Sequence, residues 1–198
     1  MSLRRSSYIV LILMATSVGC MAQRTFADRI ATPKWPDFMQ KVNAHKTMVD
    51  RLEKELPALP DKATAEQMTA HKQSLIAAVG KARSGARQGD IFSKEIAQRF
   101  VAIIRSEVRG PSGKAAKETI KEDNPNHGNV QPVTLAVNAV YPDKAPLSTV
   151  PPTLLLRLPT LPETVDYRFV GKALVLHDVR SNLIIDYMTG AEPKGGNS

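Results

Sequence analysis

The stretch DYRFVGKALVLHD, residues 166–178, decides how the second half of the chain folds. Its centre, Gly171-Lys172, suits a two-residue type II′ hairpin turn, because glycine readily adopts the positive φ that the first turn position needs. This turn places Asp166 opposite His177 on one face of the predicted hairpin. The other face is then wholly apolar, and it comprises Tyr167, Phe169, Leu174 and Leu176.

The polar face of this hairpin holds a candidate for acid–base chemistry. Asp166 and His177 would lie close enough for a charge-assisted contact, and Asp178 follows directly. A histidine oriented by a carboxylate is half of a catalytic triad, so an envelope hydrolase using His177 with Asp166 or Asp178 is one alternative function. No serine or cysteine nucleophile can be assigned beside the pair. We therefore predict no catalytic residues and interpret the pair as a cross-strand contact on the solvent face.

A hairpin alone is only marginally stable in water, so it needs further strands and a covering layer. LIIDYM, residues 183–188, predicts a third strand of an antiparallel meander, with Asp186 at an outward position by alternation. Alternation over residues 133–137 predicts a further strand. Four prolines within residues 151–162 predict an extended connector that stays out of the centre of the sheet.

Two apolar stripes at helical spacing come earlier in the chain. The first lies in a helix that ends at Pro57, and the second follows a capping box formed by Thr64 and Gln67. His45 and His71 each occupy a position on one stripe. Folding the helices about their connector would bring the two imidazoles about one helical turn apart, where they could bind a metal or sense pH. Two ligands fall short of a normal zinc site, so we predict no metal.

A third apolar stripe begins after Asp90, the expected N-cap, and ends at Gly110. Residues 112–122 are expected to form a short, exposed helix. Because short connectors between striped helices indicate antiparallel neighbours, residues 35–109 predict a three-helix bundle.

The formal net charge of +8 is concentrated in one segment. Residues 81–121 carry ten basic and four acidic side chains. Such an excess favours an anionic partner, such as nucleic acid, lipid headgroups or an acidic polymer, although a solvated helix face is the ordinary alternative. The candidate contact residues are Arg99, Arg105, Arg109, Lys114 and Lys117.

The N-terminal residues have the pattern of a secretory signal. Arg4 and Arg5 precede an uncharged run, residues 8–19, which is shorter than the roughly 20 residues of a membrane span. Export would make nucleic acid the weakest of the candidate partners, and we predict none.

The single cysteine, Cys20, lies directly after this run. Residues 17–20, SVGC, resemble a bacterial lipobox, in which the cysteine is lipidated and becomes the first residue. Ordinary cleavage after Ala22 is the alternative. In both cases the mature chain forms no disulfide, and lipidation would explain a lone cysteine in an exported protein.

Familiar catalytic and cofactor motifs are absent from the sequence. It contains no G-x-S-x-G, C-x-x-C or H-E-x-x-H, and no phosphate-binding glycine loop. We therefore expect no cofactor and no enzyme activity.

These features divide the chain into six segments. They are a signal peptide (1–22), a tether (23–34), a helical region (35–122), a linker (123–132), a β-rich region (133–190) and a disordered tail (191–198). The predicted fold class is α+β: an N-terminal signal, an antiparallel three-helix bundle, and a small antiparallel β meander with a proline-rich connector.

Residues 158–188, LPTLPETVDYRFVGKALVLHDVRSNLIIDYM, resemble a tail shared by uncharacterised exported bacterial proteins. Such tails combine an L-P-x-L-P segment, a Y-R-F-V-G turn, an alternating strand and an N-L-I-x-D end. The resemblance implies a secreted or surface-tethered protein and brings no catalytic residues.

The sequence thus predicts an exported protein of the periplasm or outer cell envelope, tethered to the membrane by a lipid on Cys20. Its predicted role is structural or binding, with a basic helical face toward an anionic envelope component. The envelope hydrolase and a metal or pH sensor that uses His45 and His71 are the alternatives, and the oligomeric state is left open.

Overall fold

The computed structural model describes residues 35–122, 124, 133–143, 145–146 and 148–191. These residues belong to one compact unit of helices and a three-stranded antiparallel sheet, so the predicted α+β class is confirmed. The predicted signal peptide and tether, and nearly all of the predicted linker and tail, lie outside the described residues.

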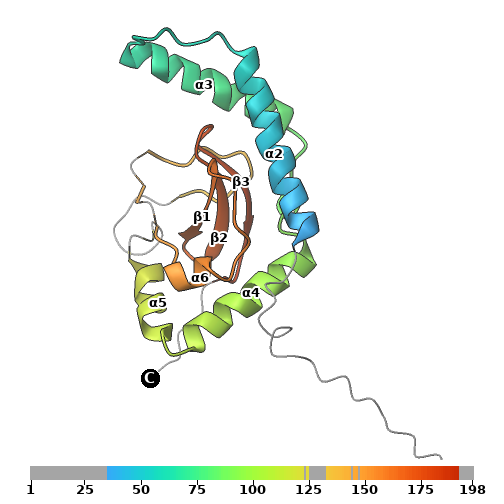
Figure 1. The fold of residues 1–198 in the computed structure, drawn as a ribbon, viewed down its shortest axis with the longest axis vertical. Coiled ribbons are helices and arrows are strands. Elements are labelled where there is room, and N and C mark those ends of the chain that lie inside the picture. Colours follow the sequence, from blue (N-terminus) through green and yellow to red (C-terminus); the bar gives the residue numbers. More distant parts are fainter. Residues whose placement is uncertain (1–34, 123, 125–132, 144, 147, 192–198) are drawn as a thin grey trace, which may run out of the picture. The chain divides into compact units, whose positions relative to one another are not determined.

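Figure 1 shows the helices arranged around the sheet. The helices are α2 (Pro36–Glu55), α3 (Ala65–Ala82), α4 (Lys94–Arg109), α5 (Gly113–Lys121) and α6 (Pro152–Leu155). The strands are β1 (Val165–Val170), β2 (Ala173–Asp178) and β3 (Leu183–Met188), which lie side by side in the order β1-β2-β3.

The hairpin of β1 and β2 has the register that the sequence predicts. Asp166 pairs with His177, and Val170 pairs with Ala173 next to the turn. Gly171 has a φ of 56°, the left-handed conformation that the first position of a type II′ turn requires. The turn chemistry alone therefore predicted the pairing of these two strands correctly.

The prediction that Asp186 points outward is wrong. The register between β2 and β3 shifts, because Leu176 pairs with Asp186 whereas His177 pairs with Ile184. Ile185 is thus an extra residue in β3, a β-bulge that reverses the alternation beyond it. Asp186 consequently lies on the same face as the apolar Leu176, and it is completely buried.

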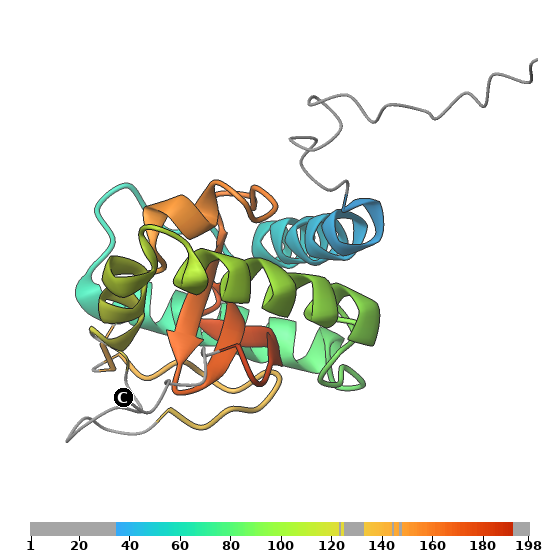
Figure 2. The same cartoon turned by 90° about the horizontal axis from the view of Figure 1, so that it is seen from below.

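One face of the sheet packs on α2 and α4 through aromatic side chains. The ring of Phe100 in α4 lies 5.2 Å from Phe38 in α2 and 5.9 Å from Tyr167 in β1, between ring centroids. Trp35, which precedes α2, lies 4.8 Å from Phe100. Burying each of these side chains stabilises the fold by roughly 1.5–3 kcal/mol. Figure 2 shows α4 lying across the strands, with α2 alongside it.

The expected three-helix bundle is not confirmed. α2 packs against α3, whereas α4 contacts α5 and α6 and turns its apolar stripe to the sheet. The apolar face of the hairpin needs a cover, and the third stripe supplies it. Helix α4 also begins later than expected, because its N-cap is Ser93 and not Asp90: the Ser93 hydroxyl accepts from the N–H of Ile96.

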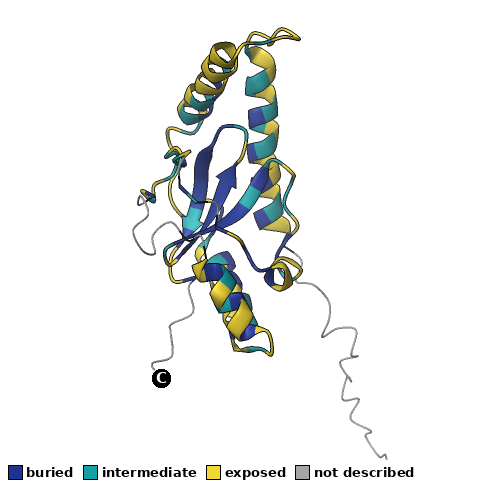
Figure 3. Ribbon diagram, turned by 90° about the vertical axis from the view of Figure 1, so that its left-hand side faces the viewer, coloured by how far each residue is buried: buried dark blue, intermediate teal, exposed yellow. Residues whose placement is uncertain are grey.

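Helices α2 and α3 meet at the end of α3 that lies far from their connector. Val49 of α2 packs with Leu75 and Val79 of α3. The capping box of Thr64 is formed as predicted. Residues 65–70, directly after it, are all exposed, as the yellow start of α3 shows in Figure 3. The two apolar stripes therefore pack together over only part of their length.

The opposite face of the sheet is covered by the described residues of segment 133–150. Tyr141 and Ile184 belong to the apolar cluster on this face. The strand predicted at 133–137 is not formed. The chain turns at Asn138, whose φ is 64°. The N–H of Asn138 donates to the carbonyl of Ile184 over 2.8 Å. This irregular segment therefore lies along the outer edge of β3.

The proline-rich connector is not extended throughout, because it contains the single-turn helix α6. Leu154 and Leu158 of this connector are buried in the same core as α4. Arg157 binds Glu107 of α4 over 3.2 Å, so the connector is fixed to the helical layer.

Candidate functional site

Two histidine–aspartate pairs border the sheet, and one of them joins α2 to the end of β2. His45 Nε2 lies 2.7 Å from Asp178 Oδ2, and the exposed fractions of the two side chains are 1% and 2%. The two residues are 133 positions apart in the sequence. His45 lies on the buried stripe of α2, as predicted, and Asp178 is the last residue of β2.

Asp178 accepts hydrogen bonds from two parts of the chain. Besides His45, the N–H groups of Arg180 and Ser181 donate to its Oδ1 over 2.9 and 3.3 Å. Burial by itself raises the pKa of Asp178, but the bond from His45 and the two N–H groups together hold that pKa below its usual value. Asp178 is therefore a carboxylate at neutral pH.

The second ring nitrogen of His45 faces a guanidinium. Arg83 Nη1 lies 3.4 Å from His45 Nδ1. Because a guanidinium can only donate, Nδ1 must accept, and the ring proton is on Nε2, where it is donated to Asp178. His45 therefore bridges a guanidinium and a carboxylate, with both ring nitrogens engaged.

Arg83 itself is held by neutral groups. Its Nε donates to Asn138 Oδ1 over 3.0 Å and its Nη2 donates to the carbonyl of Ile185. Within the described residues no carboxylate oxygen lies within 4.0 Å of this guanidinium. Burial lowers the pKa of Arg83, and more distant carboxylates, of which Asp186 is the strongest, oppose that change.

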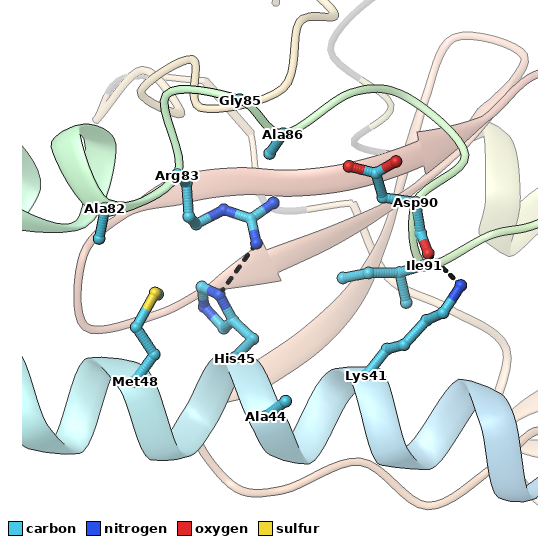
Figure 4. Close-up of a pocket in the computed structure, with 10 residues that line it drawn as sticks. All are labelled: Lys41, Ala44, His45, Met48, Ala82, Arg83, Gly85, Ala86, Asp90 and Ile91. Carbon is cyan, nitrogen blue, oxygen red and sulfur yellow. Dashed lines mark hydrogen bonds between the residues drawn. The ribbon is translucent and has the colours of Figure 1, made fainter.

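These groups border a cavity of about 460 Å³ between α2 and the segment that follows α3. Figure 4 shows the side chains of Arg83 and His45 between Met48 on one side and Asp90 with Lys41 on the other. Lys41 Nζ donates to the backbone carbonyl of Asp90. The remaining lining residues are small or apolar: Ala44, Ala82, Gly85, Ala86 and Ile91.

Asp186 fixes one wall of this cavity. Its Oδ2 accepts from the N–H groups of Ile91 and Phe92 over 2.8 and 2.7 Å, and its Oδ1 accepts from Gly89 over 2.9 Å. Charge-assisted bonds of this kind are stronger than neutral ones. The bulge in β3 therefore directs a carboxylate into the loop before α4 and holds that loop against the sheet.

The second pair, Asp166 and His177, belongs to a closed network. His177 Nδ1 lies 3.1 Å from Asp166 Oδ1, and its Nε2 lies 2.9 Å from Asn182 Oδ1. Arg168 donates to Asp166 through Nε over 3.0 Å and through Nη2. The predicted contact is present, but His177 is buried and not on a solvent face, because Tyr141 covers it with ring centroids 5.2 Å apart.

The structure gives His177 no catalytic partner among the described residues. Both of its ring nitrogens are already bonded within the network. Ser181, the nearest serine in the chain, is completely buried, and its hydroxyl has no hydrogen-bond partner. The geometry is that of a structural network and does not expose an acid–base group.

His71 does not join His45. It lines a separate cavity of about 270 Å³ between the connector, Pro57–Pro60, and the first half of α3. The expected register folded the helices symmetrically about the connector, but they meet at the far end of α3, where His45 contacts Arg83 instead. Across the described ranges, no group of three or more His, Cys, Asp or Glu side chains could hold a metal.

The basic residues predicted to contact an anionic partner do not all share one face. Arg99 lies over the ring of Trp35, with its Cζ 4.0 Å from the ring centroid. At 3.6 residues per turn, Arg105 projects about 120° away from Arg99 but only about 40° from Arg109. Arg99 therefore belongs to the packing of Trp35, and the other two form a separate exposed group.

Cys20 and the rest of the predicted signal lie outside the described residues, so the lipobox stays a prediction. None of the helices in the described part of the chain combines the length and the apolar character needed to cross a membrane.

The sequence reasoning missed Arg83, although a signal for it exists. Arg83 follows Val79 by four positions and so continues the buried stripe of α3 as a cation. A cation at such a position needs a polar partner, so the pattern predicts a polar contact at the end of α3. Its partners Asn138 and Ile185 could not have been found, since no local pattern links them to it.

Comparison with protein-family models, with curated proteins and with solved structures found no match to this chain. Its function is therefore inferred from its own residues and their geometry.

Proposed function

We propose that the protein is exported, is anchored in the cell envelope by a lipid on Cys20, and binds an anionic envelope component through cations where α4 meets α5. The leader pattern of residues 1–22 supports export and anchoring. The observation that carries the binding role is the exposure of Arg105, Arg109 and Lys114, which have no carboxylate within 4.0 Å in the described chain.

The turn between α4 and α5 brings these cations together. A Cβ on Gly113 would lie 2.3 Å from the carbonyl oxygen of Val108, so only glycine permits this close approach. Arg109 ends α4, and Lys114 is the second residue of α5. Glu118 follows Lys114 by four positions in α5, but no ion pair between them is formed among the described residues. Lys117 is half-buried and contributes less to this surface.

No observation favours the two alternative functions over this one. An envelope hydrolase would need an open acid–base group, whereas His177 is enclosed and bonded at both ring nitrogens. A sensor that uses His45 and His71 would need the two rings to meet, whereas His45 is bonded to Asp178 and Arg83. Binding is the role that the exposed, unpaired cations support.

Anchoring is tested by the intact mass and membrane partition of the mature protein, compared with Cys20→Ala. We expect a mass gain of diacylglycerol size and membrane association in the wild type, both lost in the variant. A mature chain that begins at Gln23 and partitions into the soluble fraction would overturn the anchoring.

Binding is tested by sedimentation of the Cys20→Ala protein with vesicles that contain anionic or only zwitterionic lipid. We expect binding to the anionic vesicles, weakened by salt and reduced severalfold in the double variant Arg105→Gln/Arg109→Gln. Arg51→Gln/Lys54→Gln, which also removes two exposed cations but from α2, is the matched control and should bind as the parent does. Equal binding by both variants would contradict the proposal.

A further inference from the structure

Among the described residues, the guanidinium of Arg83 has no carboxylate in direct contact. Asp178 has His45 and two N–H groups, Asp186 has the loop before α4, and Arg168 has Asp166. Arg83 is half-buried, but its partners are an amide, a carbonyl and an imidazole. A cation removed from water without a carboxylate is unfavourable unless another anion approaches it.

The guanidinium also keeps free hydrogen-bonding capacity. It has five N–H groups, and the bonds to Asn138, Ile185 and His45 use one each on Nε, Nη2 and Nη1. One N–H therefore remains on Nη1 and another on Nη2. Carboxylates often bind a guanidinium through two parallel bonds of this kind.

The cavity beside Arg83 is a groove that is open to solvent, and its volume is that of a small-molecule site. Its volume of about 460 Å³ falls within the usual range of roughly 300–1,000 Å³. Met48, Ala82, Ala86 and Ile91 give it apolar walls, and Figure 4 shows them around the guanidinium. Such walls favour an organic body over a bare inorganic ion.

The charges around the cavity favour a monoanion. Lys41 and Arg83 are cations, and Asp90 is a carboxylate whose Oδ2 accepts the N–H of Arg87 over 2.8 Å. The lining therefore carries one net positive charge. A dianion such as phosphate would meet the repulsion of Asp90 without full compensation.

We propose that this cavity binds a small organic carboxylate, with the carboxylate on Arg83 and the apolar body against Met48 and Ile91. This site is separate from the cations at the corner of α4 and α5 and does not depend on them. His45 positions the guanidinium, since its Nδ1 accepts from Nη1 and its Nε2 is fixed by Asp178.

The test is a nuclear magnetic resonance titration of the full chain with hexanoate, with hexylamine and inorganic phosphate as comparison probes. We expect saturable shifts of the backbone amides of residues 82–91 with hexanoate, at a Kd in the millimolar range or tighter. Hexylamine and phosphate should give markedly weaker binding. The absence of saturation with hexanoate, or equal binding of either comparison probe, would overturn the proposal.

Two variants test the site from different sides. Arg83→Gln removes the cation and should weaken hexanoate binding about tenfold or more. Ala44→Phe places a ring at the α2 side of the cavity without removing any group that binds Arg83, and we expect it to abolish binding. The matched control is Arg87→Gln, an exposed residue of the same segment that does not line the cavity, and it should bind hexanoate as the wild type does.

Circular dichroism and thermal melting show whether each variant is folded. If Arg83→Gln is unfolded, Ala44→Phe decides the question, because a folded Ala44→Phe that still binds hexanoate would refute this site. Unchanged binding in a folded Arg83→Gln would refute it as well.

Discussion

The pairs His45–Asp178 and Asp166–His177 contain the same chemical groups. They differ in which group contacts the neighbouring guanidinium, and in how far apart the joined elements lie in the sequence. In the first, the imidazole stands between the guanidinium of Arg83 and the carboxylate, and it joins residues 133 positions apart. In the second, Asp166 contacts both Arg168 and His177, and its side chain is 36% exposed. This network extends through Asn182 to Tyr141, but no hydrogen bond of Asp166 or His177 reaches a helix in the described part of the chain.

The first difference decides whether the positive charge is neutralised. A carboxylate that binds the guanidinium directly cancels most of its charge, as Asp166 does for Arg168. An imidazole between them fixes the geometry but keeps the carboxylate of Asp178 away from the guanidinium of Arg83, which lines the cavity. The contacts of His45 join helix α2 to strand β2. We therefore expect them to contribute more to stability than the contacts of His177.

The largest expected effect comes from Asp186→Ala, which breaks the wall of the cavity beside the His45 pair. Four backbone N–H groups that now bind this carboxylate, those of Gly89, Ile91, Phe92 and Tyr187, would lose this partner, two of them in buried surroundings. We expect the free energy of unfolding to fall by about 3–5 kcal/mol, measured by urea titration. Asp61→Ala, in the exposed connector before α3, is the control and should be close to wild type.

His45→Leu should have the next largest effect. It leaves the buried carboxylate of Asp178 with only its two backbone donors and removes one partner of Arg83. We expect a loss of about 2–3 kcal/mol in the free energy of unfolding. If Asp178→Asn is added, the second loss should be smaller than Asp178→Asn causes alone, because the two side chains interact.

His177→Leu should cost less, about 1–2 kcal/mol in the same measurement. Asp166 keeps Arg168 as a partner and is partly open to water, so no buried charge loses its only contact. A loss larger than that of His45→Leu would reverse the ranking of the two pairs.

Lowering the pH should remove the contribution of Asp178 to stability. The pKa of Asp178 in the folded protein lies below the unfolded value of about 3.8, so its stabilisation is complete above that value. It is lost as the pH falls through the lower, folded pKa, because the unfolded chain then binds the proton first. The Asp178→Asn variant should show a flatter decline than wild type in urea titrations between about pH 5 and pH 2.

The smallest effect is expected from Arg180→Gln. Arg180 binds Asp50 and Glu53 of α2 over 2.7 and 2.6 Å, so it joins the same two parts of the fold as the His45 pair, but near the surface. Exposed ion pairs contribute little and are screened by salt. The thermal midpoints of variant and wild type should converge as salt is added, and a difference that persists at high salt would contradict this ranking.

The parts of the fold that were predicted correctly depend on local geometry. The turn at Gly171 determines the register of β1 and β2, and with it the contact of Asp166 with His177. The capping box at Thr64 and the stripe of α2 likewise depend on residues a few positions apart.

The parts that were not predicted depend on distant contacts. A single extra residue, Ile185, reversed the face on which Asp186 lies, and no periodic pattern indicates such a bulge. The apolar stripe of α4 packs against the apolar face of the hairpin and not within a bundle with α2 and α3, and this determines the arrangement of the helices. The cavity beside Arg83 is lined by two separate segments, residues 41–48 and 82–91, so its residues could not be grouped from the sequence.

The contact of His45 with Asp178 also has a consequence for the timing of synthesis. α2 leaves the ribosome 133 residues before its partner. At about 5–20 residues per second, the first helix waits on the order of ten seconds for β2 to be made. Until β2 is made, Phe38 has no sheet to cover it, so the growing or translocating chain exposes apolar surface. A chain that stops before residue 178 would keep this surface exposed, because the surface is covered only when the last strands are made.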